Sequence, residues 1–111
     1  IVPRTRGGGA EIVAHLKTGS AYYAPGKSTA IMVEAILKDT KQIHPCAVLL
    51  DGEYGYKDVV SGVPIMIGAN GCEKIIEVTL NDVEKKMFKK SVDSVQSLID
   101  TLNENNFFEG E

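Results

Sequence analysis

This sequence lacks the features that several classes of protein require. It has no excess of positive charge, because 12 lysines and arginines stand against 15 aspartates and glutamates, for a net charge of −3. A nucleic-acid partner usually needs a basic face, so none is expected. No apolar run approaches the roughly 20 residues needed to cross a bilayer, so no membrane partner is expected either. The 111 residues, 43% of them hydrophobic, predict one soluble globular domain.

Cysteine is also scarce. Only Cys46 and Cys72 are present, each inside an apolar segment and without CxxC spacing. Such a pair is typical of buried free thiols in a reducing compartment rather than of a disulfide or a metal site. We therefore expect two buried thiols, no bound metal and a cytoplasmic protein.

The chain begins with Ile1, Val2 and Pro3, and it has neither an initial methionine nor a signal-peptide pattern. A translated chain does not start in this way. We therefore expect further protein upstream of Ile1.

The rest of the chain is organised around residues 17–38, KTGSAYYAPGKSTAIMVEAILK. A polar turn leads through two tyrosines and a proline into an apolar run that is broken only by Glu34. Ser28 and Thr29, which precede this run, are typical helix caps, and Lys38 supplies a cation at its other end. The pattern predicts a helix that begins at Ser28 and Thr29 and is buried on most sides.

Two glycine-containing segments have alternative explanations. Gly26, Lys27 and Ser28 reproduce the end of a nucleotide-binding P-loop, but Ala21 stands where the pattern needs glycine and no strand precedes it, so a helix start is favoured. Residues 7–9 are three glycines, which predict either an anion-binding loop before a helix or a close-packing patch on one helix.

Three β-rich runs follow. Residues 43–50 are a compact apolar run followed by residues typical of a turn, so they predict a strand of about eight residues. Pro45 indicates that this strand starts at a sheet edge or a bulge. Residues 56–67 and 72–78 flank an Asn-Gly turn, the strongest short hairpin signal. Together they predict a small antiparallel sheet.

The two histidines have no carboxylate partner fixed near them by the sequence. His15 is predicted to be a surface or cap residue, and His44, at a strand start, is predicted to be structural rather than a base.

The last element begins with Asn81 and Glu84, a capping-box pair, and apolar residues then recur every three or four positions to Leu102. This predicts an amphipathic helix of about 20 residues on the sheet. The lysines at 85, 86, 89 and 90 are expected to form a solvated face, and residues 103–111 to fray. The predicted class is α+β, a small, mainly antiparallel sheet packed with long helices.

Four blocks of this sequence carry a family resemblance: GGGAEIVAHLKTGSAYYAP, IMVEAILKD, HPCAVLLDGEYG and GVPIMIGANGCEKIIEVTLN. Their order and spacing resemble the carboxy-terminal domain of NAD-dependent malate dehydrogenases of the lactate-dehydrogenase-like type, from Gly7 to about Leu102. The sequence departs from the usual pattern at Gly26 and Lys27, where relatives more often carry small apolar residues. The resemblance favours a single helix across the glycine triplet, lying beside the active site.

The resemblance also implies where the site residues lie. Ser20 and Ala21 fall where the family places a small polar residue against the substrate, and Pro25 falls near the nicotinamide ring. Ser20 is alternatively, or additionally, a helix N-cap. The chain has no GxGxxG between a strand and a helix and no GxHG, so the NAD-binding domain, the catalytic histidine and the substrate arginines of the family are expected upstream. No catalytic residue is expected within residues 1–111.

The resemblance thus implies the substrate domain of a malate dehydrogenase of the tricarboxylic acid cycle. The parent would act on malate and oxaloacetate with NAD as a homodimer or homotetramer, and this piece alone would be inactive. We also expect it to expose apolar faces on its first two helices and to self-associate. The alternatives are a lactate-type 2-hydroxyacid dehydrogenase and a stand-alone interaction domain that presents residues 38–55.

Overall fold

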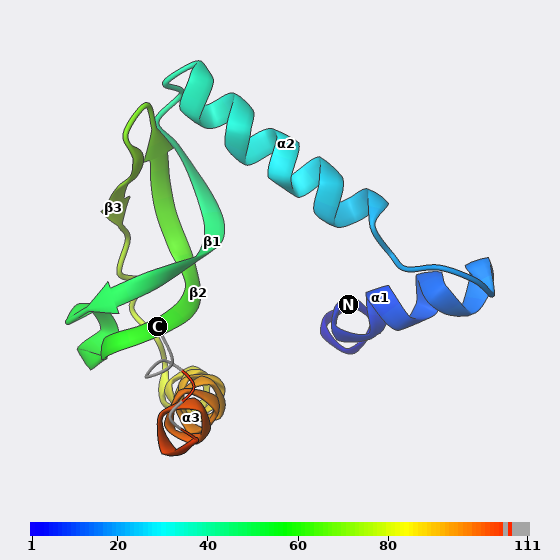
Figure 1. Cartoon of the computed structure of the whole chain (residues 1–111). Helices are drawn as coiled ribbons and strands as arrows, with labels where there is room; N and C mark the ends of the chain where they lie inside the picture. The colour runs from blue at the N-terminus through cyan, green and yellow to red at the C-terminus, as the bar shows by residue number, and fades with distance from the viewer. Residues whose placement is uncertain (106, 108–111) are drawn as a thin grey trace.

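A computed structural model describes residues 1–105 and 107 (Figure 1). Along the chain lie α1 (Val2–Leu16), α2 (Tyr23–Leu37), β1 (Gln42–Asp51), a 3₁₀ turn (Glu53–Gly55), β2 (Lys57–Gly68), β3 (Gly71–Ile75) and α3 (Asp82–Glu104). The strands form one antiparallel sheet in the order β1-β2-β3. The predicted α+β class, with a small antiparallel sheet and long helices, is confirmed.

The sheet is built around β2, whose side chains alternate between a buried and a more exposed face. Apolar residues at alternate positions produce such a half-buried strand. Residues on its buried face include Val59, Ser61, Val63, Ile65 and Ile67. The predicted Asn-Gly hairpin is confirmed between β2 and β3.

Two prolines shape the sheet. Pro45 lies on the edge strand β1, as predicted, directly opposite Pro64 of β2. Pairing between β2 and β3 ends at Ile65 and Ile75, one position before Pro64. Pro64 has no N–H to donate, and only its carbonyl continues the contact by accepting from the Ile76 N–H at 2.8 Å. The chain therefore leaves the sheet at this point.

The core lies where α2 and α3 pack against β2. Leu50 of β1 and Val59 of β2 are the largest fully buried side chains, and Ala35 of α2 and Val92 of α3 join them. Helices α2 and α3 thus contribute one buried residue each to a core supplied mainly by the strands.

The predicted start and burial of α2 are wrong. The helix begins at Tyr23, so Pro25 lies in its first turn, where a missing N–H breaks no helical hydrogen bond. Thr29 is inside the helix and its hydroxyl donates to the Pro25 carbonyl at 3.0 Å. Only Ala35 of α2 is buried, because the described residues pack against a small part of the helix surface. Leu37 is 80% exposed.

The glycine triplet lies inside α1, so the single-helix prediction is confirmed and the anion-loop alternative is wrong. A Cβ added at Gly7, Gly8 or Gly9 would meet nothing within 4 Å among the described residues. The helix interior disfavours glycine by up to about 1 kcal/mol relative to alanine. No close packing within the described part of the chain offsets that cost.

The predicted capping box of α3 is confirmed. Asn81 Oδ1 accepts from the N–H groups of Val83 and Glu84, and the Glu84 carboxylate accepts from the Asn81 N–H at 2.9 Å. Of the tail expected to fray, Asn103 and Glu104 belong to α3, and residues 106 and 108–111 lie outside the described residues.

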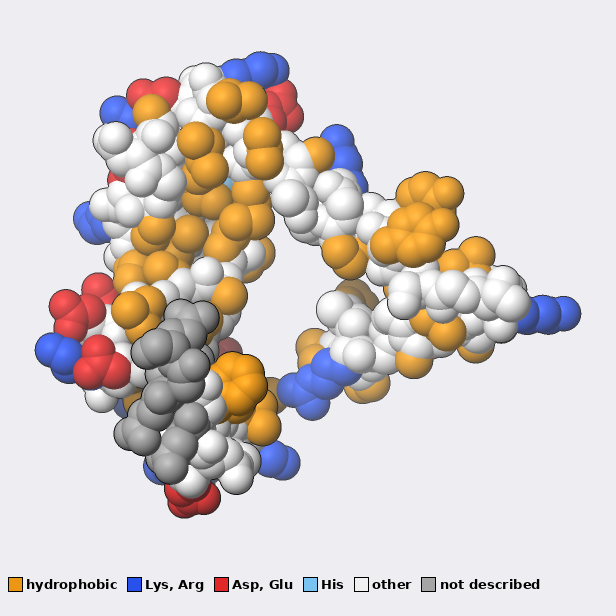
Figure 2. Space-filling model, in the orientation of Figure 1, with side chains coloured by type: hydrophobic (Ala, Val, Ile, Leu, Met, Phe, Trp, Pro, Cys, Tyr) orange, Lys and Arg blue, Asp and Glu red, His pale blue; other side chains and the backbone are white. Residues whose placement is uncertain are grey.

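The arrangement is open. Its radius of gyration is 16.7 Å, against about 13 Å for a compact domain of this length. Figure 2 shows empty space between the arm formed by α1 and α2 and the unit formed by the sheet and α3. Exposed apolar side chains on the arm include Ile12, Val13, Leu16, Met32 and Val33. The predicted exposure of apolar faces on the first two helices is confirmed.

The alternation of β1 makes two neighbouring leucines a matched pair. Leu50→Ala should lower the free energy of unfolding by about 2–5 kcal/mol, because it opens a cavity in the core. Leu49→Ala removes the same atoms from a side chain that is 58% exposed, so it should lower the free energy of unfolding far less. Urea unfolding of both variants measures the difference, and equal losses would contradict the described orientation of β1.

Candidate functional site

The loop between α1 and α2 has a defined backbone. Lys17 ends α1 in the left-handed conformation, with φ 63°, and its N–H donates to the Val13 carbonyl at 3.0 Å. Gly19 has φ 88°, which side chains rarely adopt. The Ser20 carbonyl then accepts from the Tyr22 N–H at 3.0 Å. These turns carry the chain from one helix into the next and present residues 18–21 between them.

The predicted site residues are close together in this loop and the first turn of α2. Ser20 is exposed, Ala21 is half-buried, and Pro25 is exposed. The alternative role of Ser20 as a helix N-cap is wrong, because Tyr22 occupies that position without a side-chain cap bond. Among the described residues the Ser20 hydroxyl has no hydrogen-bond partner. It is therefore available to a ligand as donor or acceptor.

The P-loop hypothesis is wrong. Gly26 and Lys27 lie within the first turns of α2, and the Gly26 N–H donates to the Tyr22 carbonyl at 2.9 Å as part of the helix. A P-loop instead holds these amides free for phosphate after a buried strand.

The α1 surface that bears Gly8 has a shallow groove of about 460 Å³, lined by Ile1, Arg4, Thr5, Gly8, Glu11 and Ile12. Arg4 Nη2 and the Glu11 carboxylate form an exposed ion pair at 2.7 Å. The hydrogen bond from Arg4 lowers the pKa of Glu11, and the pKa of Arg4 is raised in turn. Arg4 and Arg6, the cations nearest the glycine triplet in sequence, thus lie on a helix, and Arg4 is already paired.

The histidines lie on other elements. His15 is exposed in the last turn of α1, which confirms its predicted surface position. His44 is half-buried on β1 opposite Ile65, and its Nε2 is buried without a hydrogen-bond partner among the described residues. No described carboxylate accepts a hydrogen bond from His44, as a histidine base oriented by a carboxylate would require.

The two cysteines differ, so the prediction of two buried thiols is half wrong. Cys46 is buried in the core, where burial raises the pKa of its thiol, whereas Cys72 is exposed on the edge strand β3. Within residues 1–105 and 107, no three His, Cys, Asp or Glu side chains are grouped to hold a metal ion. No helix in that part of the chain has the length and apolar character to span a membrane.

Comparison with known proteins identifies what these elements belong to. Residues 1–106 match the sequence model of the lactate/malate dehydrogenase, alpha/beta C-terminal domain. The chain belongs to this family. It is 74% identical over 109 residues to malate dehydrogenase of Sulfurimonas denitrificans and 57% identical over 108 residues to that of Aliarcobacter butzleri. These alignments cover 98% and 97% of the chain but 34% of each relative, so the chain spans about a third of their length.

Solved structures of the family share the arrangement. Malate dehydrogenase from Salinibacter ruber matches with a TM-score of 0.90 at 50% identity, over 99% of this chain and 35% of that one. Lactate dehydrogenase from Eimeria maxima with NADH and oxamate matches with a TM-score of 0.89 at 38% identity, over 98% and 34%. These two structures therefore share the arrangement of helices and sheet found here.

The contrast between the cysteines predicts selective labelling. At pH 8 one equivalent of a thiol reagent should modify Cys72 rapidly, while Cys46 stays protected because it is buried and its pKa is raised. Mass spectrometry of peptides from the native protein and from protein in denaturant measures both sites. Cys72→Ser should abolish the rapid phase, and rapid native labelling of Cys46 would contradict its burial.

Proposed function

We propose that residues 1–111 are the carboxy-terminal substrate domain of an NAD-dependent malate dehydrogenase, and that the dinucleotide-binding domain lies upstream. The parent would reversibly oxidise (S)-malate to oxaloacetate. The observation that carries this proposal is the 74% identity to a malate dehydrogenase across nearly the whole chain.

The chain's own contribution would be one wall of the active site. Ser20 is held in a loop whose backbone is fixed by Lys17, Gly19 and Tyr22, and its hydroxyl is free. A hydroxyl in that position suits a substrate carboxylate, since hydrogen bonds to charged groups are the stronger kind. Ala21, like Ser20, would lie against the substrate, and Pro25 would border the nicotinamide ring.

NAD, when bound by the parent, would accept the hydride from the substrate. The described sheet of this chain is antiparallel and lacks the strand-GxGxxG-helix unit that binds a dinucleotide, so the cofactor would be held mainly by the upstream domain. The histidine that takes the hydroxyl proton would also lie upstream. Of the proposed reaction, this chain would supply binding and orientation.

Malate is favoured over lactate as the substrate. The TGSAYYAP block resembles malate-type more than lactate-type sequences, and five curated relatives between 56% and 74% identical are named malate dehydrogenase. Lactate dehydrogenases are also structural neighbours at 38–41% identity, which keeps a lactate-type enzyme as the second candidate.

The apolar surfaces of α1 and α2 suit burial in the assembled parent. Burying such side chains is favourable by roughly 25 cal/mol per Å² of apolar area. We expect the upstream domain and a second subunit of a homodimer or homotetramer to cover them, in a cytoplasmic enzyme of the tricarboxylic acid cycle. The isolated chain would instead self-associate.

The parent and the isolated chain should behave differently in an assay of NADH oxidation with oxaloacetate. The parent should be active and residues 1–111 inactive, because the proposed histidine and dinucleotide domain are absent from this sequence. An active isolated chain would contradict the proposal that the catalytic histidine and the NAD-binding domain lie upstream. A parent that prefers pyruvate to oxaloacetate would favour the lactate alternative.

Ser20→Ala in the parent should lower kcat/KM for malate by about 10–100-fold, the effect of losing a hydrogen bond to a charged group. Ser28→Ala is the matched control, because Ser28 is also exposed and has no hydrogen-bonded side chain among the described residues. Steady-state kinetics with malate measures both. Equal values for the two variants would exclude Ser20 from substrate binding.

A further inference from the structure

A second cavity lies away from the α1–α2 loop. It is a cleft of about 470 Å³ between the tip of the β1–β2 hairpin, the segment that follows β3 and the first half of α3. Its lining comprises Tyr54, Tyr56, Glu77, Val78, Thr79, Leu80, Lys85, Lys86, Phe88 and Lys89. None of the residues proposed for substrate or cofactor binding belongs to it.

Tyr54 fixes one wall of this cleft. Its φ of 57° is unusual for a bulky residue, and such conformations persist only where surrounding contacts determine them. The Tyr54 hydroxyl donates to the Ile76 carbonyl at 2.7 Å and accepts from the Val78 N–H at 3.0 Å. Its own N–H donates to Glu77 Oε1 at 2.6 Å. These hydrogen bonds hold the hairpin tip and the segment after β3 in one arrangement.

The cleft has an aromatic wall in which the Phe88 ring is tilted by 42° from that of Tyr54 and by 65° from that of Tyr56. The ring of Phe88 lies 5.1 Å from that of Tyr54 and 5.7 Å from that of Tyr56, measured between centroids. All three rings are partly exposed. Aromatic groups held in this way bind further rings by stacking or edge contacts.

The rim of the cleft is positively charged. Lys85, Lys86 and Lys89 line it, and in the described part of the chain Lys89 pairs with Asp93 at 2.7 Å whereas neither Lys85 nor Lys86 has an ion pair. Residues 82–90 hold four lysines and two carboxylates, although the chain as a whole has a net charge of −3. Within the described residues, the charges of Lys85 and Lys86 are thus available to an anion in the cleft.

Together these groups define the chemistry of a ligand. The volume is in the range of small-molecule sites, which are mostly apolar with a few placed polar groups. A planar base would stack on the Tyr56 ring and make an edge contact with Phe88, because these two rings stand at 65° to each other. A phosphate would pair with Lys85 and Lys86, and a ribose hydroxyl would donate to the Glu77 carboxylate. We propose that this cleft binds a nucleoside monophosphate, separately from the dinucleotide proposed to take part in catalysis.

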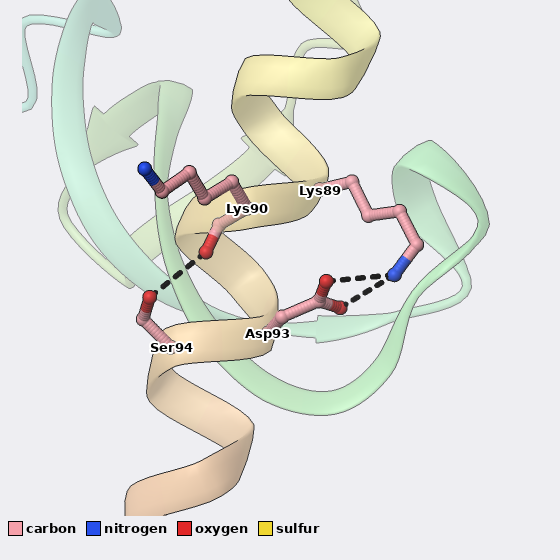
Figure 3. Close-up of polar contacts among 4 residues, drawn as sticks. All are labelled: Lys89, Lys90, Asp93 and Ser94. Atoms are coloured by element: carbon pink, nitrogen blue, oxygen red, sulfur yellow. Dashed lines mark hydrogen bonds and ion pairs between the residues drawn. The ribbon is translucent and has the colours of Figure 1, made fainter.

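Lys90 is a matched control. It follows Lys89 on α3 but does not line the cleft, and Figure 3 shows the two lysine side chains directed to different sides of the helix. All four lysines are exposed, which confirms the predicted solvated face, and three of them also line the cleft.

The test is calorimetric titration of AMP into the intact parent protein, with saturating NADH present throughout to fill any dinucleotide site. We expect one AMP per chain, weakened at least about tenfold in the double variant Lys85→Ala, Lys86→Ala and unchanged in Lys90→Ala. Adenosine and inorganic phosphate should each bind more weakly than AMP, since adenosine lacks the phosphate and inorganic phosphate lacks the base and the ribose.

Variants are compared after far-UV circular dichroism and NADH-dependent activity have shown that each is folded. Tyr56→Leu should weaken AMP binding and Tyr56→Phe should retain it, which separates ring stacking from a general effect on the fold. The proposal is overturned if AMP does not bind at millimolar concentration, if the double lysine variant binds as tightly as Lys90→Ala, or if adenosine binds as tightly as AMP.

Discussion

Burial of one face of β2 is the interaction on which the rest of this structure depends. The strand lies in the centre of the sheet, and its inward side chains form the core with buried residues of β1, α2 and α3. Its hairpin with β1 fixes Leu50 in the core, and its hairpin with β3 ends where Pro64 removes a donor. The positions of α2 and α3 follow from how they pack against that face. Helix α1 does not reach it and lies apart (Figure 1).

The sequence predicts the elements of this fold where local chemistry is decisive. The Asn81–Glu84 capping box marks α3, and alternation with an Asn-Gly turn marks the hairpin. It fails for the start of α2, because Pro25 and Gly26 look like helix breakers. Pro25 lies in the first turn, where its missing N–H breaks no helical hydrogen bond, and Gly26 donates normally to the Tyr22 carbonyl. The sequence also fails for Cys72, since an apolar segment does not show that its strand is at the sheet edge. Burial at an edge depends on tertiary neighbours.

The candidate sites are even harder to predict from the sequence than the fold. Ser20, Ala21 and Pro25 are assigned by family resemblance, and no pattern of charge or spacing distinguishes them in the sequence. The structure adds that the Ser20 hydroxyl is free and its loop defined. The cleft at Tyr54 had no sequence signal. It depends on a left-handed backbone at a tyrosine and on contacts between residues more than 20 positions apart.

The separation of the α1–α2 arm from the sheet and α3 has a consequence for the order in which the chain acquires stability. The pairings of β1, β2 and β3 join segments that are close in sequence, so they form at a low entropic cost of loop closure. The arm buries only Ala35, and its amides are protected from solvent exchange mainly by local helix formation. Helix α3 also buries a single residue, but its Phe88, Val95 and Ile99 pack against the core as well. The sheet and α3 therefore form the slowly exchanging unit, and the segment that carries Ser20 opens first.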